Sequence, residues 1–312
     1  MTDFHVVTGA FGYSGKYIAE GLLHRGHDVL TLTNSPRRPS ALAGRIRVAP
    51  LSFSDPDVLI ASLRGVRVLY NTYWVRFDHH DFTREQAVRN TAVLFEAARQ
   101  AGVERVVHVS ITKPSADSKL PYFAGKARLE ETLEATGIPH SILRPAVLFG
   151  GDDILINNIA WTLRRFPVFG VFGRGDYGIR PIHVEDFAEL AIAEGQEHGR
   201  RVMDAVGPES FTFRELVVAI GKAIGRSRPI VSIPPSLALL VARFIGMVKR
   251  DVFVTREEID GLMQRLLESD APTTGTICLT QWATQHRASL GHRYASEMQR
   301  RRRRDMAYAA TS

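Results

Sequence analysis

The amino-terminal segment constrains the fold more than any other part of the sequence. A strand-like run, Phe4–Thr8, leads directly into three glycines, Gly9, Gly12 and Gly15, and a helical pattern over residues 16–23 follows at once. A glycine-rich turn between a strand and a helix directs backbone N–H groups and the positive end of the helix towards a pyrophosphate. The segment therefore predicts a dinucleotide-binding unit.

Short β-branched runs alternate with helical stretches through the first half of the chain. This alternation is typical of a parallel sheet with helices on both faces. It predicts an α/β fold of the Rossmann type, a doubly wound parallel sheet, with a smaller carboxy-terminal substrate lobe. The expected strands are 4–8, 27–33, 45–50, 66–71, 105–110 and 141–144, and the expected helices among them are 56–63, 82–101 and 125–136.

After Gly150 the pattern loosens, and the second half has the character of insertions rather than of an independent domain. Helical patterns cover 154–165, 212–225 and 255–267, the last with Thr255 and Glu258 at the spacing of a capping box. We expect a dinucleotide-binding Rossmann core over 1–150, to which 178–206 return. A smaller substrate-binding lobe would comprise 151–177 and 207–298, and 299–312 would form a disordered basic tail.

The net charge of +7 is unevenly placed along the chain of 312 residues. Five consecutive arginines, Arg300–Arg304, and one acid, Asp305, give the segment after Met298 +4 of that charge. An arginine run at a terminus is usually a solvated end. The high proportion of basic residues therefore reflects the tail in part, and no nucleic-acid partner is expected.

Cysteine usage and hydropathy bear on the compartment. Cys278 is the only cysteine, so a disulfide within the chain is excluded, which fits a cytoplasmic protein. The first strand is expected by residue 4, which leaves no room for a signal peptide. The apolar run 237–248 is too short for a membrane span and contains Arg243. It predicts a buried or docking helix, with weak contact to a membrane surface as the minority alternative.

The residues after the second expected strand bear on the cofactor. A carboxylate at this point would bind the ribose 2′-hydroxyl of NAD(H), but the segment 33–38 has no acid and contains Asn34, Arg37 and Arg38. Arginine forms bidentate, charge-assisted hydrogen bonds with a 2′-phosphate. The sequence therefore favours NADP(H) over NAD(H). The alternative is that both arginines simply point into solvent.

A second group of residues carries acid/base chemistry. Ser110 ends the fifth expected strand, and Tyr122 and Lys126 follow four residues apart, a spacing that places both on one face of a helix. A lysine ammonium near a phenol stabilises the phenolate. Such a tyrosine can exchange a proton with a substrate oxygen while a hydride moves to or from a nicotinamide.

These motifs occur together and in a recognisable order over residues 4–190. The chain resembles the short-chain dehydrogenase/reductase superfamily, in its extended or atypical branch. It looks more like the NmrA-like and complex I accessory-subunit-like NAD(P)-binding proteins than like the sugar-nucleotide epimerases. The matching pieces are the glycine turn, Asn90-Thr91, the run ending in Ser110, Tyr122 with Lys126, Arg144-Pro145, Phe149-Gly150, the motif from Ile182 to Asp186, and Leu290-Gly291 with Tyr294.

The resemblance implies roles for the matched positions. Tyr122 would be the acid/base and Ser110 its helper, with Thr112 as a less well placed substitute. Lys126 would also bind the nicotinamide ribose. The other expected cofactor contacts are Gly9, Phe11, Gly12, Tyr13 and Gly15 along the pyrophosphate, Asn34 and Arg37 at the 2′-position, Asn71 and Thr72 beside the ribose, and Pro145 and Val147 near the carboxamide.

The substrate pocket is less well defined by the sequence. Tyr73 and Trp74 follow the fourth expected strand, where small residues are common in the family, and they would either wall the pocket or cap the sheet. Asn157 and Trp161 are expected to contribute from the lobe. No metal site is expected, because Asp78-His79-His80-Asp81 is more typical of a solvated loop. His183 and Asp186 belong to a motif that is largely structural in the family.

Three functions remain open at this point. The leading prediction is an NAD(P)-dependent oxidoreductase or epimerase that acts on a small carbonyl or alcohol substrate by hydride transfer. The alternative is a redox-silent NADP(H)-binding sensor or accessory protein. The third is a membrane-associated partner subunit, suggested by 237–248 and the arginine run. The sequence indicates neither the substrate nor the oligomeric state.

Overall fold

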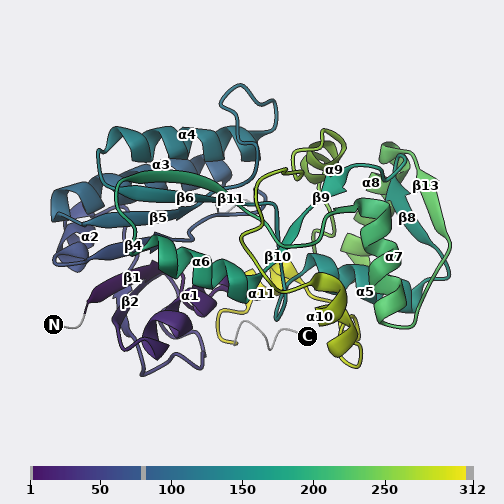
Figure 1. Cartoon of the computed structure of the whole chain (residues 1–312), viewed down its shortest axis with the longest axis horizontal. Helices are drawn as coiled ribbons and strands as arrows, with labels where there is room; N and C mark the ends of the chain where they lie inside the picture. The colour runs from purple at the N-terminus through teal and green to yellow at the C-terminus, as the bar shows by residue number, and fades with distance from the viewer. Residues whose placement is uncertain (1–2, 79–81, 307–312) are drawn as a thin grey trace. The chain divides into compact units, whose positions relative to one another are not determined.

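The computed structural model describes residues 3–78 and 82–306, and the chain divides into two compact units. Unit 1 consists of Met1–Pro145 and Phe187–Asp204, and unit 2 consists of Ala146–Asp186 and Ala205–Ser312. Helices and strands of both units are labelled in Figure 1. The sequence predicted that 178–206 return to the core. In the structure the return begins at Phe187, because β10 (Pro181–His183) pairs with β7 (Val147–Phe149) in unit 2.

The central element of unit 1 is a seven-stranded sheet with the order β11-β6-β5-β4-β1-β2-β3. From β3 to β6 the neighbouring strands pair in parallel, and β1 lies between β2 and β4. Because the chain winds outwards from β1 in both directions, the predicted doubly wound Rossmann-type sheet is confirmed. The strands are β1 Phe4–Thr8, β2 Asp28–Thr33, β3 Arg47–Pro50, β4 Val68–Asn71, β5 Arg105–Val109, β6 His140–Pro145 and β11 Arg200–Ala205.

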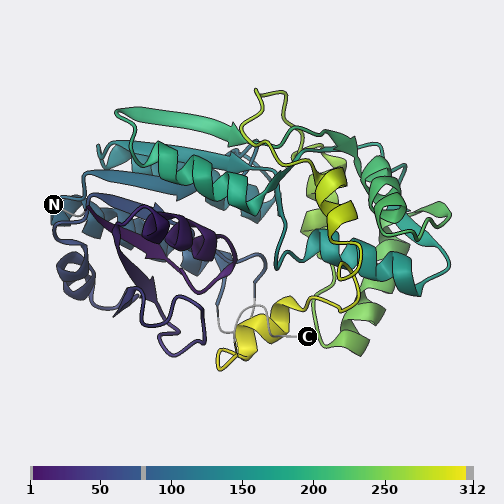
Figure 2. The ribbon, with the colours of Figure 1, turned by 60° about the horizontal axis from the view of Figure 1, so that its bottom comes forward.

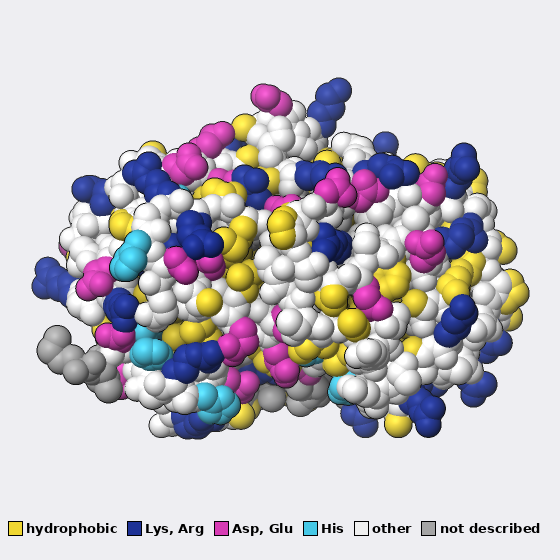
Figure 3. Space-filling view, viewed as in Figure 1, with side chains coloured by type: hydrophobic (Ala, Val, Ile, Leu, Met, Phe, Trp, Pro, Cys, Tyr) yellow, Lys and Arg dark blue, Asp and Glu magenta, His cyan; other side chains and the backbone are white. Residues whose placement is uncertain are grey.

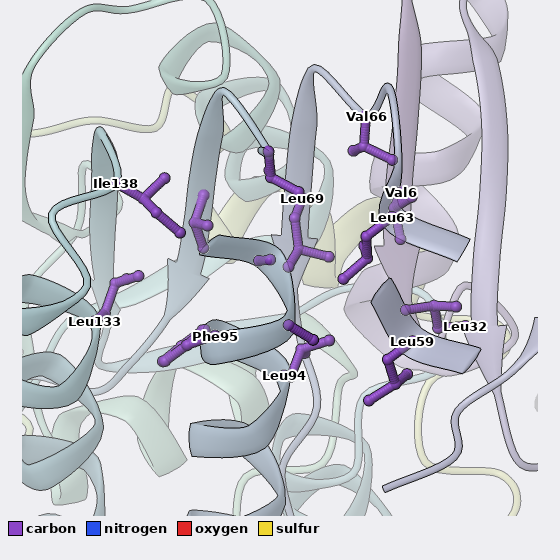
Figure 4. Close-up of a cluster of buried hydrophobic side chains, with 14 of the residues drawn as sticks. Val6, Leu32, Leu59, Leu63, Val66, Leu69, Leu94, Phe95, Leu133 and Ile138 are labelled. Carbon is purple, nitrogen blue, oxygen red and sulfur yellow. The ribbon is translucent and has the colours of Figure 1, made fainter. Parts of the chain in front are cut away.

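Helices cover both faces of this sheet. On one face α2 (Pro56–Leu63) packs on α3 (Arg84–Ala101), and α3 packs on α4 (Pro121–Ala135). The other face carries α1 (Tyr13–His24) and α6 (Val184–Glu194), as Figures 1 and 2 show. Buried side chains from strands and helices fill the space under α2, α3 and α4 (Figure 4). The labelled members of this cluster are Val6, Leu32, Leu59, Leu63, Val66, Leu69, Leu94, Phe95, Leu133 and Ile138.

A buried arginine joins the returning segment to the sheet. Arg105, at the start of β5, is 3% exposed. Its guanidinium donates to the carbonyl oxygens of Glu194 (2.6 Å) and Gly199 (2.8 Å) and to Ser141 Oγ (2.6 Å). Glu194 is the last residue of α6, where a cation also interacts favourably with the helix dipole. The three bonds fix α6 and the turn before β11 against β5 and β6.

Unit 2 is built from helices and three two-stranded sheets around a second apolar cluster. Phe149, Leu163, Ile220 and Trp282 belong to this cluster, and α7 packs on α5 and α10. Besides β7 and β10, its elements are α5 Leu155–Arg165, β8 Phe169–Phe172, β9 Gly178–Ile179, β12 Phe211–Thr212, α7 Phe213–Ala223, β13 Ile230–Ile233, α8 Pro235–Lys249, α9 Arg256–Met263, α10 Leu279–Gln285 and α11 Glu297–Arg302.

Most element bounds differ from the prediction by a few residues, and α4 differs most at its start. The sequence placed its beginning at Gly125, whereas the helix starts at Pro121. Proline is favourable at the first helical position, where no N–H is needed. Tyr122 therefore lies in the first turn of α4. The predicted capping box of Thr255 and Glu258 is present at the start of α9.

The prediction of a disordered tail from residue 299 is corrected over 299–302. These residues belong to α11, which Ser296 caps by accepting from the N–H of Gln299. Arg301 donates to Glu297 one turn earlier (2.7 Å), and the buried Arg300 donates to the carbonyl oxygen of Asp152 (2.6 Å). The arginine run therefore begins with structural contacts within unit 2. The remainder of the tail from 307 lies outside the described residues, as do 79–81 of the Asp78–Asp81 segment.

We expect Arg105→Ala to lower the free energy of unfolding by about 3 kcal/mol, because it leaves the carbonyl groups of Glu194 and Gly199 without their charged donor. Arg201→Ala is the matched control: Arg201 also pairs with Glu194 (3.3 Å), but its side chain is 42% exposed, and its loss is expected to cost less than about 1 kcal/mol. Urea unfolding of both variants measures the difference. Equal losses would contradict the role assigned to Arg105.

Candidate active site

The glycine turn has a backbone geometry that a side chain would disrupt. Gly9 adopts a positive φ of 68°, and the N–H of Gly12 donates to the Gly9 carbonyl oxygen (2.8 Å). A Cβ on Gly15 would lie 2.6 Å from that same oxygen, which is closer than any real contact. Helix α1 begins at Tyr13 with Gly12 at its N-cap, without a side-chain cap and without an acid in its first turn. The backbone N–H groups of its first turn and its positive end fit a pyrophosphate.

The end of β4 lies against this turn. Thr72 donates from its N–H to Thr8 Oγ1 (2.8 Å) and from its hydroxyl to the Thr8 carbonyl oxygen (2.6 Å). Asn71 is fully buried, accepts from Thr8 Oγ1 (3.1 Å) and lies 3.0 Å from His108 Nδ1. A Cβ on Gly15 would come within 3.2 Å of the Thr72 hydroxyl. Asn71 thus braces β4 from within the sheet, and Thr72 reaches the turn.

The end of β2 completes the same edge of the sheet. Gly9 donates to the Leu32 carbonyl oxygen (3.1 Å), and the N–H of Ala10 donates to Thr31 Oγ1 (3.1 Å). Asn34 and Arg37 follow immediately and are both exposed. The residues predicted to bind the 2′-phosphate therefore follow β2, which pairs with β1, the strand that leads into the glycine turn.

On α4, Tyr122 and Lys126 share one face, and an indole lies against both side chains. The Trp74 ring meets the Tyr122 ring edge-on with 5.5 Å between centroids, and Lys126 Nζ lies 4.4 Å from the centre of the indole. A Cβ on Gly125 would lie 3.1 Å from Trp74, so glycine lets the indole pack onto the helix. Trp74 Nε1 is buried without a hydrogen-bond partner in the described structure. Trp74 therefore packs against both predicted site residues on α4. The sequence left open whether this residue walls the pocket or caps the sheet, and its contact with substrate stays a prediction.

Lys126 is buried within unit 1. The residue is 2% exposed, and its Nζ donates to the Val109 carbonyl oxygen (2.6 Å). Burial lowers the pKa of Lys126 to about 7, and the nearby Glu130 carboxylate opposes this shift. The side chain can therefore change its charge near neutral pH.

Ser110 contacts Glu130, and neither this residue nor its partner Arg144 was among the site residues expected from the sequence. Its hydroxyl donates to Glu130, and Glu130 forms an ion pair with Arg144, whose Nε lies 3.0 Å from Oε1. Glu130 lies one turn after Lys126 on α4, so an acid at that spacing was the available signal. In this arrangement the Ser110 oxygen has acceptor capacity left for a ligand. Its predicted role as a helper of Tyr122 stays a prediction.

The remaining predicted residues fall in different places. Pro145 ends β6 and accepts from the N–H of the buried Thr112 (3.3 Å), whereas Val147 lies in β7 of unit 2 and pairs with Pro181. Tyr73 accepts from Asn90 Nδ2 (2.9 Å), and burial raises the pKa of its phenol to about 12.

The two lobe residues have structural partners within unit 2. Asn157 donates to the Arg293 carbonyl oxygen (2.9 Å) and accepts from the N–H of Gly291 (3.1 Å). The Trp161 ring packs on Tyr294 at 5.1 Å. Their part in a substrate pocket remains a prediction. Asp186, for which a structural role was expected, accepts from the N–H groups of Thr276 and Ile277 (both 2.8 Å).

Comparisons with known proteins agree with this geometry. Residues 9–159 match the NAD(P)H-binding family. Subunit 9 of the NADH dehydrogenase (ubiquinone) 1 alpha subcomplex, mitochondrial, from Arabidopsis thaliana is 25% identical over 247 residues, which is 76% of this chain and 61% of that protein. The mitochondrial NADH-ubiquinone oxidoreductase 40 kDa subunit of Neurospora crassa is 22% identical over 262 residues, which is 81% of this chain and 69% of that protein.

Solved structures share the fold at low identity. A nucleoside-diphosphate-sugar epimerase from Staphylococcus aureus has a TM-score of 0.74 with 17% identity and covers 91% of this chain and 100% of its own. The Citrobacter sp. triphenylmethane reductase complexed with NADP(H) has a TM-score of 0.73 with 18% identity and covers 90% and 99%. The chain thus carries a match to the NAD(P)H-binding family over residues 9–159 and shares the fold of these epimerase and reductase structures. Both findings agree with the resemblance to the extended short-chain dehydrogenase/reductases that its motifs predicted.

We expect the stability that Lys126 contributes to rise with pH. Its pKa is about 7 in the folded chain and about 10.4 when unfolded. Between these values the unfolded chain binds more protons, so raising the pH favours the folded state. Urea unfolding of wild type and Lys126→Met at pH 7, 8 and 9 should show a growing difference in favour of wild type, and the same comparison for the exposed Lys119→Met should not. A difference that stays constant with pH would refute the buried, titrating lysine.

Proposed function

We propose that the chain is an NADP(H)-dependent oxidoreductase, or an epimerase that works through transient oxidation, acting on a small carbonyl or alcohol substrate. The observation that carries the proposal is the group on α4: Tyr122 in the first turn, Lys126 buried one turn later, and Trp74 in contact with both. A redox-silent binding protein has no need of a tyrosine at this point, whereas a proton-transfer site requires one.

The cofactor would be held at the carboxyl edge of the sheet. The cradle at Gly9 and Gly15, which a Cβ would fill, and the uncapped start of α1 fit its pyrophosphate. Thr72 lies beside that turn, and Lys126 is the candidate for the nicotinamide ribose. When bound, the nicotinamide supplies or accepts the hydride.

The chain's own residues would manage the proton. In reduction Tyr122 Oη gives a proton to the substrate carbonyl oxygen, which becomes a hydroxyl. In oxidation the phenolate takes the proton back from the hydroxyl. Lys126 supplies positive charge beside the phenol when it is protonated, and the Ser110 oxygen can accept a hydrogen bond from the substrate. Glu130 and Arg144 position Ser110 through the bonds described above.

The preference for NADP(H) rests on the end of β2. The segment from Asn34 to Arg47 has no acid, and Arg37 is exposed immediately after the strand that pairs beside the glycine turn. An exposed guanidinium is free to form a bidentate pair with a 2′-phosphate. A carboxylate that would favour the free 2′-hydroxyl is missing from this segment.

We expect Tyr122→Phe to reduce turnover by about 100-fold or more, since a general acid or base typically contributes that factor. NADPH binding should remain, because the phenol hydroxyl is not among the cofactor contacts proposed. The measurement is a screen of carbonyl and alcohol substrates that follows NADPH absorbance, paired with NADPH binding by fluorescence. A variant as active as wild type would remove Tyr122 from the mechanism.

Arg37→Ala tests the cofactor preference separately. Loss of one charge-assisted pair should weaken NADPH binding about tenfold and leave NADH binding nearly unchanged. Arg47→Ala is a control: this arginine lies over the Phe4 ring at the start of β3. Tighter binding of NADH than of NADPH to wild type would contradict the preference for NADP(H).

The accessory or sensor function is the second candidate, and the surface of α8 favours it. Leu237, Leu240, Phe244, Met247 and Val248 are between 47% and 73% exposed, and their spacing places them along one helix face. Of the two expectations for 237–248, a buried helix is therefore wrong. We keep as a proposal that α8 docks onto a partner or a membrane surface. NADPH binding without turnover of any substrate in the screen would favour this second candidate.

Other partner and compartment predictions also remain proposals. Among the described residues, the structure contains no helix that combines the length and apolar character needed to cross a bilayer. On the face shown in Figure 3, Lys and Arg side chains are interspersed with Asp and Glu side chains. This mixture is usual for a solvated surface and supports the absence of a nucleic-acid partner. A cytoplasmic location fits the single Cys278.

A further inference from the structure

Three potential ligand groups converge at the amino edge of the unit 1 sheet. The parallel register pairs Phe4 with Asp28 and His5 with Val29. Residues Asp3 and His27, one step earlier on each strand, therefore lie side by side, and His5 projects to the same face as Asp3. One ligand atom from each of Asp3, His5 and His27 lies within 4.8 Å of the other two.

His5 is the unusual member of this group. The side chain is fully buried, and neither Nδ1 nor Nε2 has a hydrogen-bond partner in the described structure. Buried polar atoms are almost always satisfied, so two orphaned nitrogens on one ring require an explanation. The His27 ring lies 4.5 Å from the His5 ring, centroid to centroid, and is tilted by 60°. This ring contact provides no hydrogen bond for the two His5 nitrogens.

The pairing of Asp3 leaves one of its carboxylate oxygens available to a further partner. Asp3 forms an ion pair with Arg67 through Oδ2, and a carboxylate has a second oxygen for another partner.

We propose that Asp3, His5 and His27 form a binding site for a divalent transition-metal ion, with Zn²⁺ as the preferred occupant and water completing a tetrahedral shell. Two imidazoles and one carboxylate suit zinc, and bond lengths of about 2.0–2.2 Å require the ligand atoms to draw together by roughly an ångström. The metal would tie the start of β1 to the turn between α1 and β2.

The site is distant from the candidate active site. It lies at the amino edge of the sheet, whereas the glycine turn follows the carboxyl end of β1, about 17 Å further along a five-residue strand. The ion would therefore stabilise unit 1 without taking part in hydride transfer. The site was not predictable from the sequence, because residues 3, 5 and 27 match no metal-ligand spacing and the β1–β2 register brings them together.

The test is zinc binding to the full chain, produced without a histidine tag and stripped with a chelator. Isothermal titration with Zn²⁺ and the melting temperature with and without Zn²⁺ are measured on wild type and on His27→Ala, a partly exposed position that tolerates truncation. His24→Ala, an exposed histidine in the last turn of α1, is the matched control. A double variant of His79 and His80 controls for the other histidine pair of the sequence.

We expect one Zn²⁺ per chain and a rise in melting temperature for wild type. Affinity should fall at least about tenfold in His27→Ala, with the rise lost, and both should persist in His24→Ala and in the double variant. Asp3→Asn should weaken binding in the same direction. Either of two results would overturn the proposal: no stabilisation of wild type by Zn²⁺, or equal affinity in wild type and His27→Ala.

Discussion

The close approach of Gly15 to the carbonyl group of Gly9 is the constraint on which the candidate site depends. Helix α1 can start directly after β1 only because no side chain stands between these two backbones. That start brings the first turn of α1 to the sheet edge, next to Thr72 from β4 and to the backbone hydrogen bonds with β2. The ends of three strands therefore meet at one place, where the fold class binds its ligands.

A second constraint is the balance of charge around α4. Lys126 has little exposure to water, and its ammonium is offset only by a backbone carbonyl, an indole face and the more distant Glu130. Glu130 is itself committed to Arg144 and Ser110. Burial removes water from the Lys126 ammonium, and Glu130, which is paired with Arg144, only partly opposes the resulting fall in the pKa of this lysine.

The fold was largely predictable because local signals agreed with the global arrangement. The glycine turn, the strand of Phe4–Thr8 and the helix of Pro56–Leu63 were expected with the bounds they have. The spacing of Tyr122 and Lys126 predicted that they share one helix, and both lie on α4; their catalytic roles stay a prediction.

Contacts between distant segments were not predictable in this way. Trp74 contacts Tyr122 and Lys126 across the space left by Gly125. The sequence left open whether it walls a pocket or caps the sheet, because its position depends on the path of a loop. Glu130, Arg144 and the role of Arg105 depend on which strands become neighbours. The prediction for residues 299–302 was wrong for a related reason. The charge of Arg300 predicted a solvated side chain, whereas its guanidinium donates to the carbonyl oxygen of Asp152, which is remote in the sequence.

The bonds of Arg105 also bear on the order in which the chain can become a protein. All six strands from β1 to β6 precede residue 146, but the carbonyl groups that Arg105 binds belong to Glu194 and Gly199. During synthesis, which proceeds from the amino terminus at about 5–20 residues per second, the sheet therefore waits for the first stretch of unit 2 to emerge before its β6 edge is covered. For those seconds Arg105 lacks its two carbonyl partners, and the outer edge of β6 has no neighbouring strand. A chaperone or another nascent chain has access to this edge during that interval.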